Sequence, residues 1–301
     1  MPSPDYRYQT YVLVACLGGS AEAAEGEGPR GKFVSKAQTR LAFAVTDVHA
    51  WGNHFGDGEE AGFKNEIDFH VLLQDATHPE VADAIAEAVD HLDFHFDDSK
   101  GGSLNFVFSG HGYPDGDLAL EDGPLSADQL MEWCTAGRAG QNGNTRHLRL
   151  VIDSCYAGLS LARMMIHPTH WTKAVIRDAL AACLPSQEAF ELPSVGHSVL
   201  TYTRLRPYAN EMPPSGSSTE EEHRRWMDEE YPHWRAARRE TTQYLTNGRQ
   251  HALDLINGHA IGLASNAGRS VDVADWPEKI ELDKLVEALD HLPRSGRPYK
   301  W

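Results

Sequence analysis

The stretch "NFVFSGHGYP", residues 105 to 114, places a histidine between two glycines directly after an apolar run. That run, residues 104–108, predicts a buried strand, because strands covered by helices on both faces have near-continuous apolar sequences. The apolar run at 148–152 ends in the same way and leads into "DSCYAG", residues 153 to 158. Each predicted strand is therefore followed at once by a side chain capable of chemistry, an imidazole after the first and a thiol after the second.

A helix is expected between these two runs. It begins at Ser126, and Gln129 stands at capping-box spacing from it. A strand, a helix and a strand in this order form a β-α-β unit, whose crossover makes the two strands parallel. Both strands then end at one sheet edge, so neighbouring strands about 4.8 Å apart would bring His111 and Cys155 within reach of each other.

Other parts of the sequence extend this pattern. Strands are also expected at residues 11–17, 41–45, 69–73, 198–203 and 260–264. The stretch 76–92 predicts an amphipathic helix, because Thr77 and Glu80 form a capping box and apolar residues recur along one stripe. We therefore expect an α/β fold with a mostly parallel sheet covered by helices on both faces, and the family resemblance given below implies about six strands in a central sheet flanked by helices.

Length and composition are those of one large domain. The chain has 301 residues, of which 41% are hydrophobic and 24% charged, enough to bury a sizeable core. We expect a single domain over residues 1–301, with a polar inserted excursion at about 207–234. Arg224 and Arg225 within that excursion are candidate sites of self-cleavage, because exposed loops of this composition are readily nicked.

The formal net charge of −17 repels polyanions. Nucleic acid and anionic membranes are therefore not expected as partners, and a substrate with basic residues suits this charge better. The four cysteines include no C-x-x-C pair, so the sequence predicts neither a zinc site nor a redox dithiol. No apolar run approaches the length of about 18 residues that a membrane span needs. We expect reduced thiols and a cytoplasmic location.

The imidazole and the thiol suit acyl transfer. A thiol becomes a strong nucleophile as the thiolate, which a nearby imidazole generates or stabilises, so Cys155 is the candidate nucleophile and His111 the candidate base. The backbone amides of Gly112 and Cys155 are candidate donors to an acyl oxyanion. Taken singly, a glycine-flanked histidine is more often a turn residue and a lone cysteine a core residue. Their joint placement at two adjacent strand ends favours catalysis.

With an apolar strand running into S-G-H-G and, one helix later, a strand running into D-S-C-x-[SA]-G, the sequence resembles the caspase-like cysteine peptidases. This group includes caspases, metacaspases, paracaspases and bacterial relatives, and the resemblance covers about residues 66–160. It implies a caspase-hemoglobinase fold, a catalytic dyad at His111 and Cys155, and no cofactor. Tyr156 and Ala157 stand where metacaspases usually have His and Ser, so their calcium dependence is not carried over.

For a protein of bacterial type, the resemblance also implies a role in antiviral defence or cell death. Because no recognisable binding domain accompanies the peptidase motifs, activation is expected to come from a separate partner protein or from cleavage within the chain's own loops. Two other functions stay open. One is a non-catalytic regulatory or scaffold protein of the same fold, which would have no physical need for both His111 and Cys155, and the other is a peptide ligase that uses the same dyad.

Three acidic or small polar residues are candidates for substrate binding. Asp153 shares a face with Cys155 if the strand stays extended, and its carboxylate would disfavour the thiolate until a basic side chain binds there. Alternatively, Asp153 only caps the following helix or holds a loop. Metacaspase-like enzymes with Asp at this position cleave after basic residues, so the resemblance implies cleavage after Arg or Lys. Ser265 ends a late strand, where the resemblance implies a small polar residue near the substrate's first side chain. Asp47, in the loop after an early strand, is a candidate for the same pocket or, equally, a turn residue.

Two weaker patterns could hold a metal ion. His91 and His95 stand four residues apart, a spacing that suits a helix face. The stretch 114–123 carries three carboxylates that hard cations favour, those of Asp115, Asp117 and Asp122. No third ligand accompanies the histidines, and an acidic loop is more often simply solvated, so we expect no metal site.

Overall fold

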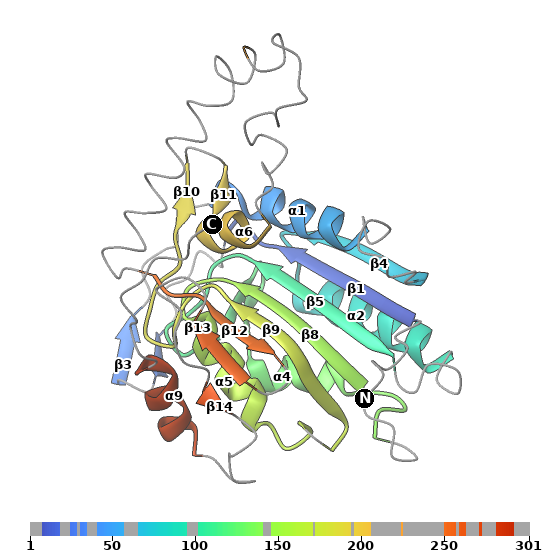
Figure 1. Cartoon of the computed structure of the whole chain (residues 1–301). Helices are drawn as coiled ribbons and strands as arrows, with labels where there is room; N and C mark the ends of the chain where they lie inside the picture. The colour runs from blue at the N-terminus through green and yellow to red at the C-terminus, as the bar shows by residue number, and fades with distance from the viewer. Residues whose placement is uncertain are drawn as a thin grey trace.

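The computed structural model describes residues 8–18, 25–28, 31–34, 41–56, 66–94, 102–140, 146–170, 172–193, 196–205, 224, 250–256, 259–262, 271–272 and 281–291. An eight-stranded sheet forms its centre, in the order β14-β13-β12-β9-β8-β5-β1-β4 (Figure 1). Its strands are β1 (Tyr8–Ala15), β4 (Glu66–Gln74), β5 (Ser103–Ser109), β8 (Arg146–Asp153), β9 (Ala174–Ala181), β12 (Leu253–Ile256), β13 (His259–Gly262) and β14 (Val271–Asp272). Three two-stranded pairs stand apart from it: β2 (Glu25–Gly28) with β3 (Gly31–Val34), β6 (Leu118–Leu120) with β7 (Gly123–Leu125), and β10 (Glu191–Leu192) with β11 (His197–Ser198).

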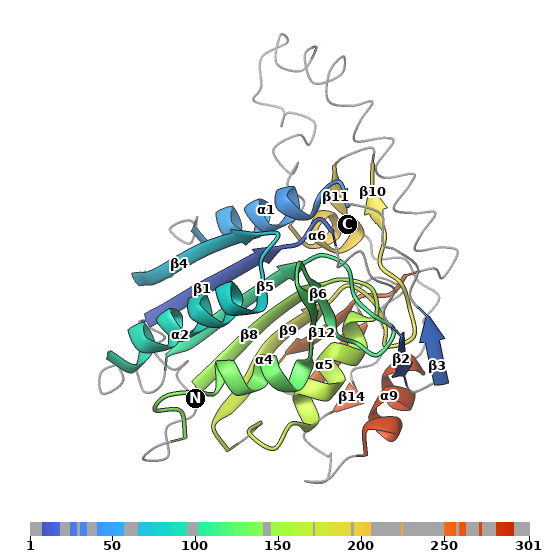
Figure 2. The same ribbon diagram turned by 180° about the vertical axis from the view of Figure 1, so that it is seen from behind.

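The five strands β4, β1, β5, β8 and β9 are parallel, and β12 to β14 are antiparallel additions at one edge. Helices cover both faces, with α1 and α6 on one side and α2, α4 and α5 on the other (Figures 1 and 2). The helices are α1 (Ala44–Gly56), α2 (His78–Phe94), α4 (Ala127–Cys134), α5 (Ala157–Ile166), α6 (Val199–Leu205) and α9 (Leu282–Asp290). The predicted α/β class with a mostly parallel central sheet is thus confirmed.

The central strands are buried because their sequence leaves little polar surface on either face. Every residue of β5 is buried, and β8 has only two half-buried positions. The predicted β-α-β unit is present: β5 and β8 are parallel neighbours, and Ser109 pairs with Asp153 at their carboxyl ends. The predicted N-cap of α4 is present too, since Ser126 Oγ accepts a hydrogen bond from the Gln129 amide at 3.1 Å. At the start of α2, the Thr77 amide donates to the Glu80 carboxylate at 2.8 Å, which is one of the two bonds of a capping box.

Two predicted strands are helical instead. Residues 41–43 are irregular and α1 begins at Ala44, which places the buried Ala44, Val48 and Trp51 on one helical stripe. Residues 199–205 form α6, and the Ser198 hydroxyl accepts from the Thr201 amide at 3.0 Å, as an N-cap does. Both stretches are short apolar runs, whose periodicity does not distinguish a strand from a buried helix.

Other expectations were incomplete. The strands β9 and β12 were not predicted, and the acidic stretch expected to be a solvated loop contains most of the β6–β7 hairpin, where Leu118, Leu120 and Leu125 are buried. The excursion at 207–234 lies outside the described residues except for Arg224, which is exposed. Within the part of the chain that is described, no helix is long and apolar enough to cross a membrane.

Candidate active site

The histidine loop, residues 110–117, follows the carboxyl end of β5 and is held in place by backbone hydrogen bonds. The Gly110 amide donates to the Asp153 carbonyl of β8 at 3.1 Å, and the Ala119 amide donates to the His111 carbonyl at 3.0 Å. A Cβ on Gly110 would come within 3.0 Å of the Cys16 carbonyl oxygen, so this position requires glycine. His111 itself is half-buried.

The cysteine loop, residues 154–156, follows β8 at the same sheet edge. Cys155 follows Asp153 by two residues, and Tyr156 then takes a left-handed conformation with φ of 57° before α5 begins. This conformation is strained for a tyrosine, and residues so constrained are concentrated at functional sites. The Tyr156 amide donates to the Gln187 carbonyl at 2.8 Å, and the Gly158 amide donates to the Cys183 carbonyl at 3.0 Å. The loop after β9 therefore supports the turn that follows Cys155.

The two loops touch where the sequence predicts they would. A Cβ on Gly112 would overlap the Cys155 carbonyl oxygen, so the backbone after His111 lies directly against the backbone of the cysteine. The fold thereby brings His111, Gly112 and Cys155 together at the carboxyl ends of adjacent parallel strands, which is where open α/β sheets bind ligands. The candidate oxyanion donors are the backbone amides of the two residues that meet in this contact, Gly112 and Cys155.

Cys155 differs from the other three cysteines in its exposure. It is half-buried, whereas Cys16, Cys134 and Cys183 are buried. Burial raises the pKa of the Cys155 thiol above its ordinary value, and the Glu188 carboxylate raises it further, as does Asp153 in its ionised form. The resting thiol is therefore protonated near neutral pH, and it needs a base to become a nucleophile.

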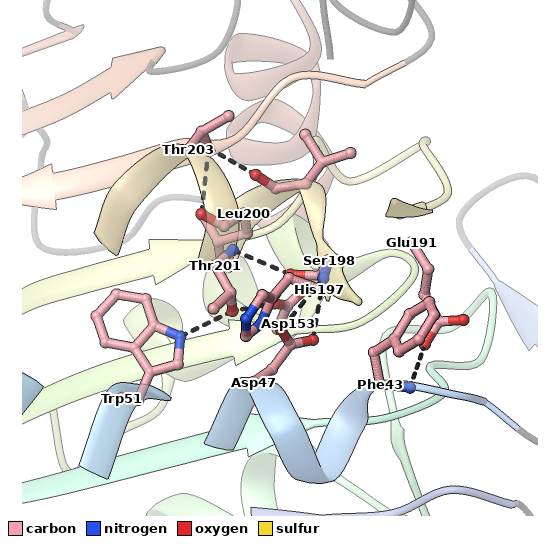
Figure 3. A network of polar contacts seen from close by, with 11 residues as sticks. Phe43, Asp47, Trp51, Asp153, Glu191, His197, Ser198, Leu200, Thr201 and Thr203 are labelled. Atoms are coloured by element: carbon pink, nitrogen blue, oxygen red, sulfur yellow. Dashed lines mark hydrogen bonds and ion pairs between the residues drawn. The ribbon is translucent and has the colours of Figure 1, made fainter. Parts of the chain in front are cut away.

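A buried polar network lies beside the cysteine loop and joins α1, β8 and α6 (Figure 3). Asp153 Oδ2 accepts from the Ser198 hydroxyl and, at 3.0 Å, from the Thr201 hydroxyl. Asp47 Oδ1 accepts from His197 Nδ1 at 2.8 Å and from the Ser198 amide at 3.1 Å. The two predicted substrate-binding carboxylates therefore meet on either side of one serine.

This arrangement departs from the sequence expectation in two details. Asp47 lies in the first turn of α1 and not in a loop, because the preceding apolar run is helical. The strand β8 ends at Asp153, so the alternation used to place Asp153 and Cys155 on one face does not continue to Cys155. The Asp153 carboxylate is nevertheless close enough to raise the pKa of the Cys155 thiol. It does hold a neighbouring segment, as the alternative assignment supposed, but that segment is α6.

Four further residues of this region were missed from the sequence. His197, Ser198 and Thr201 supply hydrogen bonds to the two carboxylates, and their only sequence signal is the S-x-x-T spacing of an N-cap. Glu191 is the fourth: its carboxylate accepts from the Phe43 amide at 3.0 Å, at the start of α1. Burial raises the pKa of Asp153, and the nearby Asp47 and Glu191 carboxylates add to this effect.

The remaining predicted site residues lie elsewhere. Ser265 and His95 are outside the described residues. The acidic stretch is engaged in protein contacts: Asp117 pairs with Arg163 of α5 at 3.3 Å, and Asp122 pairs with His78 at 2.7 Å. In the described part of the chain, no group of three or more histidine, cysteine or acidic side chains could hold a metal ion.

Comparisons with known proteins give little beyond this geometry. No protein-family model matches the chain, and no curated protein matches it. Among solved structures, the crystal structure of caspase-1 from Spodoptera frugiperda is similar at 11% sequence identity, with a TM-score of 0.41 over 70% of this chain and 74% of that chain. Likeness at this level carries no argument about activity, so the function rests on the site itself.

Proposed function

We propose that this chain is a caspase-like cysteine endopeptidase that cleaves proteins after arginine or lysine. The observation that supports it most is the contact between two loops at the ends of adjacent parallel strands, where Gly112 lies against the Cys155 backbone. A scaffold protein would have no need to bring an imidazole and the one half-buried thiol of the chain to this edge.

In the proposed reaction, His111 takes the thiol proton of Cys155, and the resulting thiolate attacks the substrate carbonyl carbon. The amides of Gly112 and Cys155 donate to the oxyanion that forms, and His111 then returns the proton to the leaving amine. The acyl group remains on the sulfur as a thioester until water, activated by the same imidazole, releases it. The N-terminus of α5, which begins two residues after Cys155, favours the negative sulfur.

The substrate class follows from the charges beside the nucleophile. The Asp47 and Glu191 carboxylates lie close enough to Asp153 to raise its pKa, and Glu191 also raises the pKa of Asp47. His197 is the one basic side chain paired with this group among the described residues. A site with this excess of carboxylates attracts a cationic side chain and repels aspartate. Cleavage after Arg or Lys, and not after Asp, is the expected result.

The test compares otherwise identical fluorogenic peptides with Arg, Lys, Asp or Ala before the scissile bond. Wild-type protein should cleave the Arg and Lys peptides, and Cys155→Ala or His111→Ala should lower kcat/KM by about 10³-fold or more while the fold remains intact. Asp153→Asn should reduce cleavage after Arg selectively. Preference for Asp, or unchanged turnover in Cys155→Ala, would contradict the proposal.

A further inference from the structure

The two carboxylates beside the nucleophile are unusual in having little positive charge to balance them. Asp47 is 1% exposed and Asp153 is 4% exposed, and Ser198 bridges them through its amide and its hydroxyl. His197 is the one basic side chain among the described residues that pairs with either of them. Two ionised carboxylates that are buried on either side of one serine repel each other, which favours a proton on one of them.

The hydrogen bonds indicate which carboxyl group is the neutral one. Asp47 accepts from the His197 ring and twice from the Ser198 amide, and these donors stabilise its ionised form. Among the described residues, the donors to the Asp153 carboxyl group are the hydroxyls of Ser198 and Thr201, both to Oδ2. Thr201 Oγ1 accepts from the Trp51 indole at 3.0 Å, and the threonine hydroxyl donates to Asp153.

We propose that Asp153 carries a proton in the resting protein and that the basic side chain of the substrate displaces it, so that substrate binding is linked to the release of one proton. His197 acts in this as a positioning residue, since its hydrogen bond to Asp47 stabilises the ionised form of that carboxylate and so favours the proton on Asp153. The inference rests on the proposed cleavage after basic residues. In the exchange, the O–H bond of the Asp153 carboxyl group breaks, the proton passes to the solvent, and a guanidinium–carboxylate pair forms.

The surroundings of Asp153 support this direction. Burial raises its pKa most, followed by the Asp47 carboxylate, with a smaller effect from Glu191 on β10, while the hydroxyls of Ser198 and Thr201 oppose the shift. Burial raises the pKa of Asp47 as well, but the His197 hydrogen bond and charge oppose it. A cation bound between Asp47 and Asp153 would offset the repulsion between their negative charges and favour the ionised form of both carboxylates.

The linkage has a consequence for pH. Where Asp153 holds its proton, a cationic ligand must displace it, so the affinity for the ligand should rise up to tenfold for each unit of increasing pH. Above the pKa of Asp153, the affinity should no longer change. A neutral ligand of the same shape should show no such dependence.

Isothermal titration calorimetry on the full-length Cys155→Ala protein tests the linkage without turnover. The probe is acetyl-arginine amide, and the matched control ligand is acetyl-citrulline amide, which has the same shape without the charge. Titrations at pH 7 in phosphate and in Tris, whose ionisation enthalpies differ, give the number of protons released per ligand bound. We expect a release approaching one proton for the arginine ligand and no proton-linked binding of the citrulline ligand.

Two further substitutions in the Cys155→Ala protein locate the proton. Asp153→Asn should weaken binding of the arginine ligand at least tenfold and abolish proton release. Asp47→Asn retains the Asp153 carboxylate but removes the repulsion, so it should lower proton release to less than half while binding persists. Thermal unfolding of each variant confirms that it is folded.

The outcomes separate the two claims. Arginine binding without proton release would overturn the linkage and leave the basic-residue specificity standing. Proton release that is unchanged in both Asp153→Asn and Asp47→Asn would show that the proton comes from another group, and it would overturn the linkage too. Absence of arginine binding together with absence of cleavage after arginine would overturn the proposed substrate class itself.

Discussion

Replacing Thr201 with valine tests the buried network through stability. Thr201 is 0% exposed, and its hydroxyl donates to Asp153 and accepts from Trp51, each at 3.0 Å. Valine keeps the volume but removes both hydrogen bonds, and it leaves the buried indole N–H without its partner. A lost hydrogen bond contributes about 1 kcal/mol and an unpaired buried donor costs about 1–3 kcal/mol, so Thr201→Val should lower the free energy of unfolding by about 3 kcal/mol.

Thr201→Ser is the matched control, because it keeps the hydroxyl and removes one methyl group. It should cost only about 1 kcal/mol from lost burial and the small cavity. The assay is urea unfolding followed by far-ultraviolet circular dichroism. The variants are compared with wild type only where the free energy of unfolding falls with the same slope against urea concentration. A loss below about 1 kcal/mol for Thr201→Val, or a larger loss for Thr201→Ser, would refute the assigned hydrogen bonds.

Three other substitutions test how the site is held. Arg163→Gln breaks the ion pair with Asp117 in the histidine loop and should lower kcat/KM several-fold, with recovery in Arg163→Lys. Because burial raises the pKa of Asp117 to about 6, the difference in kcat/KM between Arg163→Gln and wild type should shrink below that pH. A difference that stays constant with pH would count against this role. Gly112→Ala should lower kcat/KM at least about 100-fold by pushing the histidine loop off the Cys155 backbone, and unchanged turnover would show that the contact is not needed. Arg146→Met, at the opposite sheet edge, removes the ion-pair partner of the largely buried Asp93 carboxylate and should destabilise the protein by about 3–5 kcal/mol. The kcat per folded molecule should stay constant. A variant as stable as wild type would contradict this.

The part of the site that was predictable depends on strand adjacency. His111 and Cys155 each follow a continuous apolar run, and the single helix between the runs requires parallel strands. Those two features suffice to place an imidazole and a thiol at one edge. Neither feature depends on distant parts of the chain, which is why the sequence alone indicates this pairing.

The network around Asp153 was not predictable in the same way. It joins residues about 150 and 45 positions apart, as in the contacts of Asp47 with His197 and of Asp153 with Ser198. The flanking segments were also assigned to strands, since short apolar runs such as residues 41–45 fit either structure. Only tertiary packing against the sheet decides that α1 and α6 are helices and that their first turns face each other.

The central claim is that Cys155 is the nucleophile of a peptidase that recognises basic side chains. Labelling with a peptidyl arginine chloromethyl ketone, followed by peptide mapping by mass spectrometry, tests it most directly, because the three other thiols serve as internal controls. Burial raises the pKa of Cys16 and Cys134 to about 12, so neither should compete. The account predicts one adduct per chain, on Cys155, which forms much more slowly in His111→Ala and with the corresponding aspartyl reagent. An adduct mainly on Cys16, Cys134 or Cys183, or equal labelling by the arginyl and aspartyl reagents, would contradict it.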